Sequence, residues 1–302
     1  MKLALKIDVD TYRGTLEGVP RLMEILKRHE APATFLFSLG PDHTGRALRR
    51  VFRRGFLAKV RRTSVMRHYG LRTLLYGTLL PGPDIGRRAA ALLRSVHAAG
   101  FEVGIHSYDH VRWQDHVADA DATWTRREME AAWQRFEDLF ALRPQVHGAA
   151  GWQMNGHALR LEQRLGLRYA SDSRGTHPFW PVWRGEPIAC PQLPTTLPTL
   201  DELIGREDIT EENVADHLLG MTLEPPATGH VFTLHAELEG GALAPVFERL
   251  LSGWREQGYE LTDLAGLWAT LDPERLPYHE LILGPVPGRA GVLLLQGPPF
   301  PG

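Results

Sequence analysis

Residues 2–10 read KLALKIDVD, and this stretch decides the fold. Side chains of a β-strand alternate between two faces. One face would carry only apolar side chains, namely Leu3, Leu5, Ile7 and Val9. The other face would carry Lys6, Asp8 and Asp10, with both carboxylates at the end of the strand. Sites in α/β proteins form at the carboxyl ends of parallel strands, so we predict a site here. Capping of the following turn by the two aspartates is the alternative.

Strand-like and helix-like segments alternate along the chain. Strands are expected at 2–10, 33–39, 101–106, 145–150, 169–172, 188–197 and 230–237. Helices are expected at 14–30, 85–99, 119–142, 155–166, 210–222, 243–257 and 261–271. This order predicts a parallel α/β protein whose right-handed crossovers close a barrel, with a doubly wound open sheet as the competing topology. From residue 272 the chain is rich in proline and glycine, which indicates a tail, either loosely ordered or packed on the surface.

Composition narrows the class of protein. The chain has 302 residues, of which 43% are apolar, and a formal net charge of -2, which argues against a general nucleic-acid binder. Its single cysteine, Cys190, excludes an intrachain disulfide and a multi-cysteine metal site. The charged first strand leaves no room for a signal peptide, and no apolar run is long enough to span a membrane. We therefore expect a globular protein that fits a reducing compartment or is indifferent to redox state.

Two histidines follow the expected strand at 101–106. His106 and His110 form the only histidine pair at i, i+4 spacing in the chain. Like Asp8 and Asp10, they fall at the carboxyl end of a strand. Two imidazoles and one carboxylate, with positions left open for water, are typical of a catalytic site for a divalent metal ion.

A further histidine, His235, ends the apolar strand at 230–237. It would bring a third polar side chain to the same rim of the sheet. A core histidine that is hydrogen-bonded to the backbone is the alternative interpretation.

These motifs resemble those of the polysaccharide deacetylase family, the NodB-like carbohydrate esterases. The segments that carry the likeness are IDVDT at 7–11, RG at 13–14, GIH at 104–106, the following His110, AAGW at 149–152, SDSRG at 171–175, LPT at 197–199 and HAE at 235–237. The resemblance covers residues 2–268 and implies a distorted (β/α)7 barrel. We therefore expect a NodB-like domain at 1–271 with a basic amphipathic insertion at 43–83, followed by a tail at 272–302.

The resemblance also implies roles for the rim residues. Asp10, His106 and His110 would hold a divalent metal ion, which could be Zn, Co, Ni, Mn or Fe. Asp8 would be the general base and His235 the general acid. The family has adjacent aspartates, whereas here Val9 separates the two.

Other residues of the motifs would support the site. The family has an arginine near Gly151 that pairs with the base; this chain has none there, so we hypothesise that Lys6 replaces it. A backbone N–H near Gly151 would stabilise the oxyanion, and Trp152 would stack on a sugar or pack in the core. Asp172 would orient His235 or the sugar, or simply belong to a turn, and Arg174 would bind substrate or support the site.

The segment 43–83 contains no acidic residue, and ten arginines and lysines lie between Arg46 and Arg72, interleaved with apolar side chains. This mixture is typical of a segment that binds the surface of an anionic membrane. A solvated basic helix is the alternative, and contact with nucleic acid is a weaker rival.

The motifs are similar, more narrowly, to those of the family members that deformylate a sugar carried on undecaprenyl phosphate. The implied reaction is metal-dependent hydrolysis of the formamide of undecaprenyl-phosphate-linked 4-formamido-4-deoxy-L-arabinose. This reaction would occur at the cytoplasmic face of the bacterial inner membrane and serve lipid A modification and polymyxin resistance. The alternatives are an N-deacetylase of another amino sugar or glycan, and a catalytically dead carbohydrate-binding protein at the membrane surface.

Overall fold

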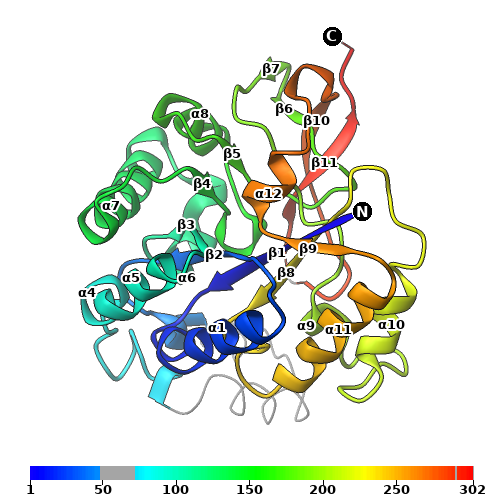
Figure 1. Cartoon of the computed structure of the whole chain (residues 1–302). Coiled ribbons are helices and arrows are strands. Elements are labelled where there is room, and N and C mark those ends of the chain that lie inside the picture. Colours follow the sequence, from blue (N-terminus) through cyan, green and yellow to red (C-terminus); the bar gives the residue numbers. More distant parts are fainter. Residues whose placement is uncertain (48–71, 290, 302) are drawn as a thin grey trace.

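Strand β1 (Lys2–Val9) lies inside a seven-stranded parallel sheet. The computed structural model describes residues 1–47, 72–289 and 291–301 (Figure 1). The strand order is β5-β4-β3-β2-β1-β8, and β9 pairs with the first half of β1. The other strands of this sheet are β2 (Thr34–Ser38), β3 (Glu102–Ser107), β4 (Val146–His147), β5 (Tyr169–Ala170), β8 (His230–His235) and β9 (Glu260–Thr262).

The gap between the outer strands β5 and β8 is bridged by an irregular segment. Leu193 donates its backbone N–H to the carbonyl of Ala170 in β5, and Thr196 donates to Val231 in β8. The expected strand at 188–197 therefore forms isolated bridges rather than a regular strand, because its prolines lack the N–H that a ladder needs. The result is a distorted, incompletely closed barrel, which confirms the predicted fold class.

Helices surround this sheet (Figure 1). Their bounds are η1 (Gly14–Gly18), α1 (Val19–Arg28), α4 (Ile85–Arg88), α5 (Ala90–Ala98), α6 (His110–His116), η2 (Val117–Asp119), α7 (Ala122–Phe140), η3 (Ala150–Trp152), α8 (Gly156–Leu165), α9 (Leu200–Leu203), α10 (Val214–Gly220), α11 (Ala244–Glu256), α12 (Leu264–Trp268) and η4 (Pro273–Arg275). The segment expected as one helix at 261–271 instead contains the end of β9 and the whole of α12. The side chain of Asp263 caps α12 by accepting from the N–H of Gly266, which sets the boundary.

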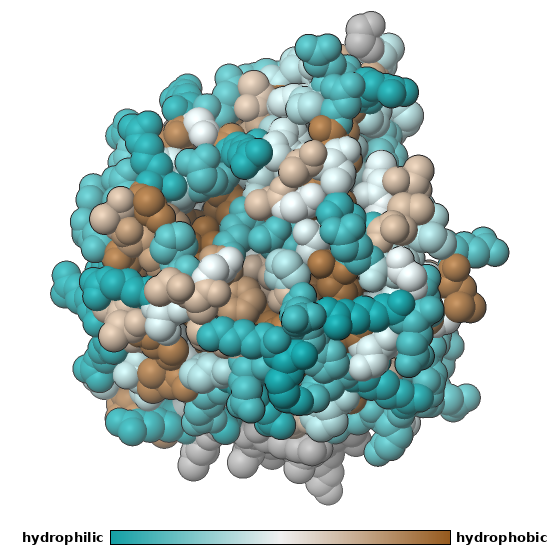
Figure 2. All heavy atoms as spheres, viewed as in Figure 1, coloured by the Kyte–Doolittle hydropathy of each residue, from teal (hydrophilic) through white to brown (hydrophobic). Residues whose placement is uncertain are grey.

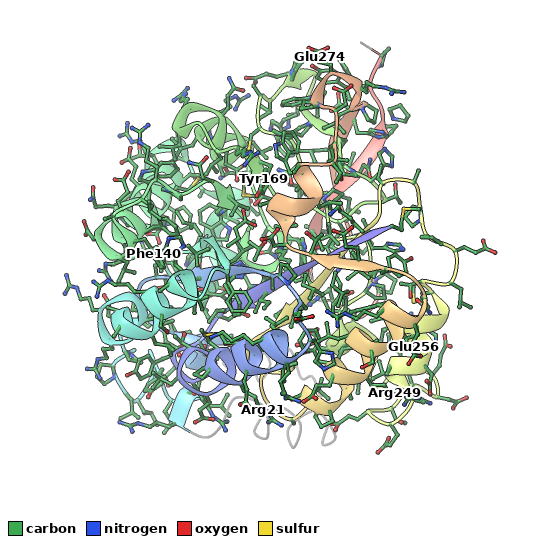
Figure 3. The ribbon with its side chains drawn as sticks, in the orientation of Figure 1. Arg21, Phe140, Tyr169, Arg249, Glu256 and Glu274 are labelled. Carbon is green, nitrogen blue, oxygen red and sulfur yellow. The ribbon has the colours of Figure 1, made fainter. Side chains whose placement is uncertain are left out.

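The apolar face of β1 packs into the main core, as its alternation predicts. Leu3, Leu5, Ile7 and Val9 are fully buried there with side chains of α1, α5, α7 and α11. In Figure 3, Tyr169 lies among other side chains inside the fold, whereas Arg249 and Glu256 of α11 lie at its edge. The face of the molecule in Figure 2 is mainly hydrophilic, with apolar residues scattered over it.

The segment expected to be a tail is part of the fold. β10 (Tyr278–Gly284) and β11 (Leu293–Pro299) form an antiparallel hairpin, and β10 pairs with β6 (Trp180–Trp183), which in turn pairs with β7 (Glu186–Pro187). Leu281, Leu293 and Leu294 are buried under this second sheet. Of the two expectations for this segment, a loosely ordered tail is therefore wrong: the buried leucines of β10 and β11 pack the hairpin onto the rest of the protein, despite the prolines at its turn.

Most of the basic insertion lies outside the described residues, since 48–71 fall in the middle of it. Its described end includes Leu79, which is 78% exposed. Within the described parts of the chain, no helix combines the length and apolar character that a membrane span requires.

Candidate metal centre and active site

Three parallel strands end at one rim and bring the predicted residues together. The register of the sheet places Asp8 of β1 beside His235 of β8. Asp10 follows the end of β1, and His106 lies near the end of β3, two strands away. Side chains that are more than two hundred residues apart in sequence thus share one edge of the sheet.

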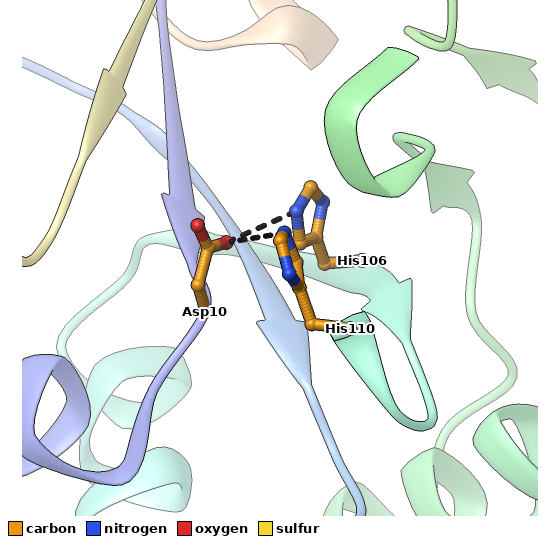
Figure 4. Close-up of side chains that lie close together, drawn as sticks. All are labelled: Asp10, His106 and His110. Carbon is orange, nitrogen blue, oxygen red and sulfur yellow. Dashed lines mark ion pairs between the residues drawn. The ribbon is translucent and has the colours of Figure 1, made fainter. Parts of the chain in front are cut away.

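Asp10, His106 and His110 converge on one point (Figure 4). The Oδ1 atom of Asp10 lies 3.1 Å from Nε2 of His106 and 3.4 Å from Nε2 of His110. The two imidazole rings are stacked, with centroids 5.2 Å apart. His106 belongs to β3, whereas His110 is the first residue of α6, so a strand, a short turn and a helix start produce the i, i+4 pair.

The turn between the two histidines is fixed by Asp109. Its side chain caps α6 by accepting from the N–H of Arg112 at 3.1 Å, and its other oxygen lies 2.5 Å from Nδ1 of His43. This cap starts the helix at His110 and so determines where that ring points.

The donor atoms of this triad fit a divalent cation. Nδ1 of His106 lies 2.6 Å from the carbonyl oxygen of Gly148, so it carries the proton and leaves the Nε2 lone pair facing Asp10. Oδ1 of Asp10 is buried and has no hydrogen-bond partner among the described residues. One oxygen and two nitrogens within 4.8 Å of one another form the open Asp-His-His set that suits Zn, Fe, Co, Ni or Mn.

The electrostatics of Asp10 and His110 favour the protonation states that metal binding needs, whereas burial of His106 is outweighed by Asp8 and Asp10, which raise its pKa. Burial lowers the pKa of His110 to about 4, so its imidazole is neutral at physiological pH. Burial acts to raise the pKa of Asp10, but His110 and His106 outweigh it and hold that pKa far below its usual range. A neutral imidazole and an ionised carboxylate are the forms that act as ligands.

Asp8 lies behind the triad with a lysine beside it. Asp8 is 3% exposed, and its Oδ2 lies 3.7 Å from Nζ of Lys6. Lys6 is fully buried and donates to the carbonyl of Ser171 at 2.8 Å. Burial lowers the pKa of Lys6, although Asp8 opposes this shift. Lys6 therefore lies beside Asp8, as the hypothesis that it replaces the family's arginine requires.

His235 is buried near an aspartate that sequence reasoning missed. The Nδ1 atom of His235 lies 3.8 Å from Oδ1 of Asp201, and its backbone N–H donates to Glu239 at 2.8 Å. Trp152 meets the imidazole edge to face, with ring centroids 6.5 Å apart. The alternative of a core histidine bonded to backbone through its ring finds no support in these contacts.

Trp152 is only 1% exposed, so its ring cannot stack on a sugar. Its faces meet cations instead: the guanidinium carbons of Arg174 and Arg289 each lie 4.9 Å from the ring centre, and Nζ of Lys6 lies 5.3 Å away. Arg174 also pairs with Glu202 at 2.6 Å. The structure thus corrects the sugar-stacking interpretation, because the tryptophan is a packing centre for the residues around His235.

Asp172 does not contact His235, which corrects the hypothesis that it orients that ring. Its Oδ1 accepts from the N–H of Ala149 at 2.8 Å and lies 2.9 Å from Nδ1 of His147. That Nδ1 lies 2.6 Å from Glu162, and all three side chains are buried. Burial acts to lower the pKa of His147, but Asp172 and Glu162 raise it to about 10. Asp172 therefore pairs with His147, next to Gly148, whose carbonyl oxygen accepts from His106.

Gly151 has a backbone conformation that explains the residue type. Its φ of +62° lies in the left-handed region, and a Cβ there would fall 2.1 Å from the side-chain nitrogen of Gln114. The left-handed backbone therefore favours glycine in the middle of η3, next to Trp152.

Glu237 is a further residue that sequence reasoning left without a role, although it belongs to the HAE motif. Its Oε1 accepts from the backbone N–H of Asp10 at 3.1 Å and of Thr11 at 2.8 Å. It therefore fixes the loop after β1 that carries Asp10. The signal was its position two residues after His235, in the turn that follows β8, the strand adjacent to β1.

This chain belongs to the polysaccharide deacetylase family, whose model matches residues 4–170. The match includes β1 and the Asp10, His106 and His110 triad. Curated relatives extend the similarity over nearly the whole chain.

Two relatives share the name "Probable 4-deoxy-4-formamido-L-arabinose-phosphoundecaprenol deformylase ArnD". The protein from Shewanella sediminis is 37% identical over 98% of this chain and 94% of its own length. The protein from Wigglesworthia glossinidia brevipalpis is 29% identical over 94% of this chain and 98% of its own length.

Solved structures share the fold at low sequence identity. A polysaccharide deacetylase candidate of Mycobacterium smegmatis superposes with a TM-score of 0.63 at 17% identity, covering 94% of each chain. The peptidoglycan N-acetylglucosamine deacetylase Bc1960 does so with a TM-score of 0.55 at 13% identity, covering 89% of each chain. A pseudoenzyme of Bacillus anthracis also has the fold, with a TM-score of 0.50 at 15% identity over 92% of this chain and 69% of its own. The fold alone therefore does not establish catalysis, and the residues of the site must carry that argument.

Proposed function

We propose that this protein is a metal-dependent amidohydrolase that removes the formyl group from undecaprenyl-phosphate-linked 4-formamido-4-deoxy-L-arabinose. The observation that carries the proposal is the convergence of Asp8, Asp10, His106, His110 and His235 at one rim. Relatives that bear the deformylase name along almost the full length of the chain support the choice of substrate.

Hydrolysis of an amide needs an activated nucleophile, stabilisation of the oxyanion and a proton for the departing nitrogen. A divalent cation held by Asp10, His106 and His110 would supply a water of lowered pKa and polarise the carbonyl. The remaining demands fall on side chains of this chain.

Asp8 is the proposed general base. Its Oδ1 is buried without a hydrogen-bond partner among the described residues and lies 3.8 Å from Nδ1 of His106, beside the ligand triad. A carboxylate oxygen in that position can accept the proton of the attacking water. Lys6 places a positive charge on the other side of the same carboxylate.

His235 is the proposed general acid. Its position beside Asp8, on the adjacent strand, brings the proposed acid and the proposed base to the same rim of the sheet. The Nδ1 edge faces Asp201, so Nε2 is the atom left to protonate the departing amine. Gly151 and its neighbours in η3 would add a backbone donor for the oxyanion.

The substrate is anchored in a bilayer, so we further propose that the enzyme works as a peripheral protein on the cytoplasmic face of the inner membrane. The composition of 43–83, with ten cations and no acid, supports attraction to anionic lipid. Exposed Leu79 at the described end of this segment is consistent with an apolar contact. Deleting residues 46–76 should abolish binding to anionic vesicles while hydrolysis of a water-soluble formamido sugar is retained.

Product analysis tests the function. Purified, metal-loaded protein is incubated with 4-formamido-4-deoxy-L-arabinose 1-phosphate and with the matching acetamido sugar, and formate and acetate are measured. Formate release in large excess over acetate supports the deformylase. Acetate release alone would identify an N-deacetylase, and no release of either acid would favour a catalytically dead binding protein.

A further inference from the structure

If Nε2 of His235 donates a proton to the substrate, a partner at Nδ1 is needed to orient the ring. The side chain of His235 is buried, and Nδ1 has no hydrogen-bond partner among the described residues. The acidic atom that faces this nitrogen is Oδ1 of Asp201, at 3.8 Å. That distance is too long for a hydrogen bond, but catalytic hydrogen bonds often shorten only when substrate binds.

Asp201 is held in place by an arginine from the other end of the chain. Two nitrogens of Arg289 reach it: Nη2 donates to Oδ1 at 3.2 Å, and Nη1 lies 3.1 Å from Oδ2. A guanidinium that meets a carboxylate through two nitrogens fixes the direction as well as the position of that carboxylate. Thr199, which caps α9, donates to the same Oδ1 at 2.6 Å.

Arg289 lies in the turn between β10 and β11, the hairpin that sequence reasoning assigned to a tail. Its Nε donates to Glu202 of α9 at 2.8 Å, and Arg174 pairs with that same carboxylate at 2.6 Å. Gly288 has a φ of +86°, and a Cβ there would fall 2.6 Å from the carbonyl oxygen of Glu202. The turn is therefore packed directly against α9.

The hairpin is also joined to the strand region that contains Arg174. The N–H of Arg174 donates to Leu294 of β11 at 2.9 Å, and the N–H of Gln296 donates back to Arg174 at 2.8 Å. These bonds hold β11 in place on one side of the turn, and so they fix the position from which Arg289 contacts Asp201.

We propose that the C-terminal hairpin completes the active site, with Arg289 as a positioning residue that holds Asp201 beside Nδ1 of His235. Asp201 then orients the ring and stabilises its positive charge, so that Nε2 can donate to the leaving amine. This inference rests on the proposed role of His235 as the proton donor. It assigns a function to Arg289, which lies outside the motifs of the family.

A comparison of two leaving groups separates the proposed role of Arg289 from a purely structural role. An amine must be protonated as it departs, whereas 4-nitrophenolate leaves as a stable anion and needs no acid. The full-length, metal-loaded enzyme is therefore assayed on the formamido sugar phosphate and on 4-nitrophenyl acetate. Variants Arg289→Gln and Asp201→Asn are compared with Arg275→Gln, an exposed arginine of η4, as the matched control.

We expect Arg289→Gln and Asp201→Asn to lower kcat for the amide, relative to kcat for the ester, about 10–100-fold, as loss of an orienting partner does. The double variant should lose no more than the worse single variant, because both changes remove one interaction. Arg289→Lys should recover part of the activity, and Arg275→Gln should match wild type. Circular dichroism and metal content report whether each variant is folded and loaded.

Equal losses on amide and ester, or no loss on either, would overturn the inference. If wild type cleaves an acetamido sugar but not the formamido sugar, the deformylase proposal fails, and the same ratio measured on the acetamido substrate decides the role of Arg289. A wild-type enzyme that cleaves neither amide would overturn both.

Discussion

The buried cluster of His147, Glu162 and Asp172 makes a quantitative prediction for stability. Nδ1 of His147 lies 2.6 Å from Glu162 and 2.9 Å from Asp172, and all three residues are at most 4% exposed. Replacing His147 with Gln leaves two carboxyl groups facing each other without a cation. Removal of one partner from a buried charged pair costs about 3–5 kcal/mol of unfolding free energy.

The pKa of His147 leads to a similar value. The pKa of His147 rises from an ordinary 6.5 to about 10. At pH 7, protonation of this histidine therefore adds about 4 kcal/mol to the free energy of unfolding. A raised pKa gives stability that is complete below pH 6.5 and is lost as pH rises through 10. Glu162, whose pKa burial raises to about 8, acts in the same direction between pH 4.5 and 8. Asp172 acts oppositely, because its pKa is lowered and its contribution is lost in acid.

Urea unfolding followed by circular dichroism measures this effect. Wild type should lose stability between pH 7 and 10, and His147→Gln should be about 3–5 kcal/mol less stable at pH 7 with a flatter profile. His157→Gln, an exposed histidine of α8, is the matched control and should change little. A cost below about 1 kcal/mol for His147→Gln, or wild-type stability that rises from pH 7 to 10, would refute the reasoning.

Three further substitutions test the site. Asp10→Asn should weaken metal binding at least about 10-fold, as judged by metal content after dialysis, and unchanged content would argue against the triad as the ligand set. Lys6→Met should lower kcat about 10-fold without loss of metal if the lysine supports Asp8, so unchanged activity would exclude that role. Gly151→Ala should destabilise the fold by about 1–3 kcal/mol in thermal unfolding, because its left-handed backbone conformation opposes a side chain, and a wild-type Tm would contradict this.

The sequence was most informative where local pattern and site coincide. The alternation in β1 identified both its core face and its carboxylates, and the strand ends at His106 and His235 followed the same rule. Parallel strands bring such residues to one edge, so the proximity of Asp10, His106 and His110, which the family resemblance proposes as metal ligands, could be predicted without coordinates.

The other features of the site depend on contacts between distant residues, which no local sequence pattern indicates. Asp201 and Arg289 are 88 positions apart, and a turn rich in proline and glycine does not indicate that it packs against a short helix. Likewise, the contact between Asp172 and His147 could not be inferred from the sequence. The two residues are distant in sequence and meet because β4, which contains His147, pairs with β5, which precedes Asp172. β9 escaped notice because three residues are too few to show a period.

The central claim is that Asp8 acts as the base beside a metal ion held by the triad, in hydrolysis of a lipid-linked formamide. The most direct test is formate release from undecaprenyl-phosphate-linked 4-formamido-4-deoxy-L-arabinose by wild type, chelator-treated wild type and Asp8→Asn, with the exposed Asp119→Asn as control. We predict release by metal-loaded wild type and Asp119→Asn, loss on chelation with recovery when metal is restored, and a decrease of at least about 100-fold in Asp8→Asn. Formate release that survives chelation, or that proceeds at the wild-type rate in Asp8→Asn, would contradict the account.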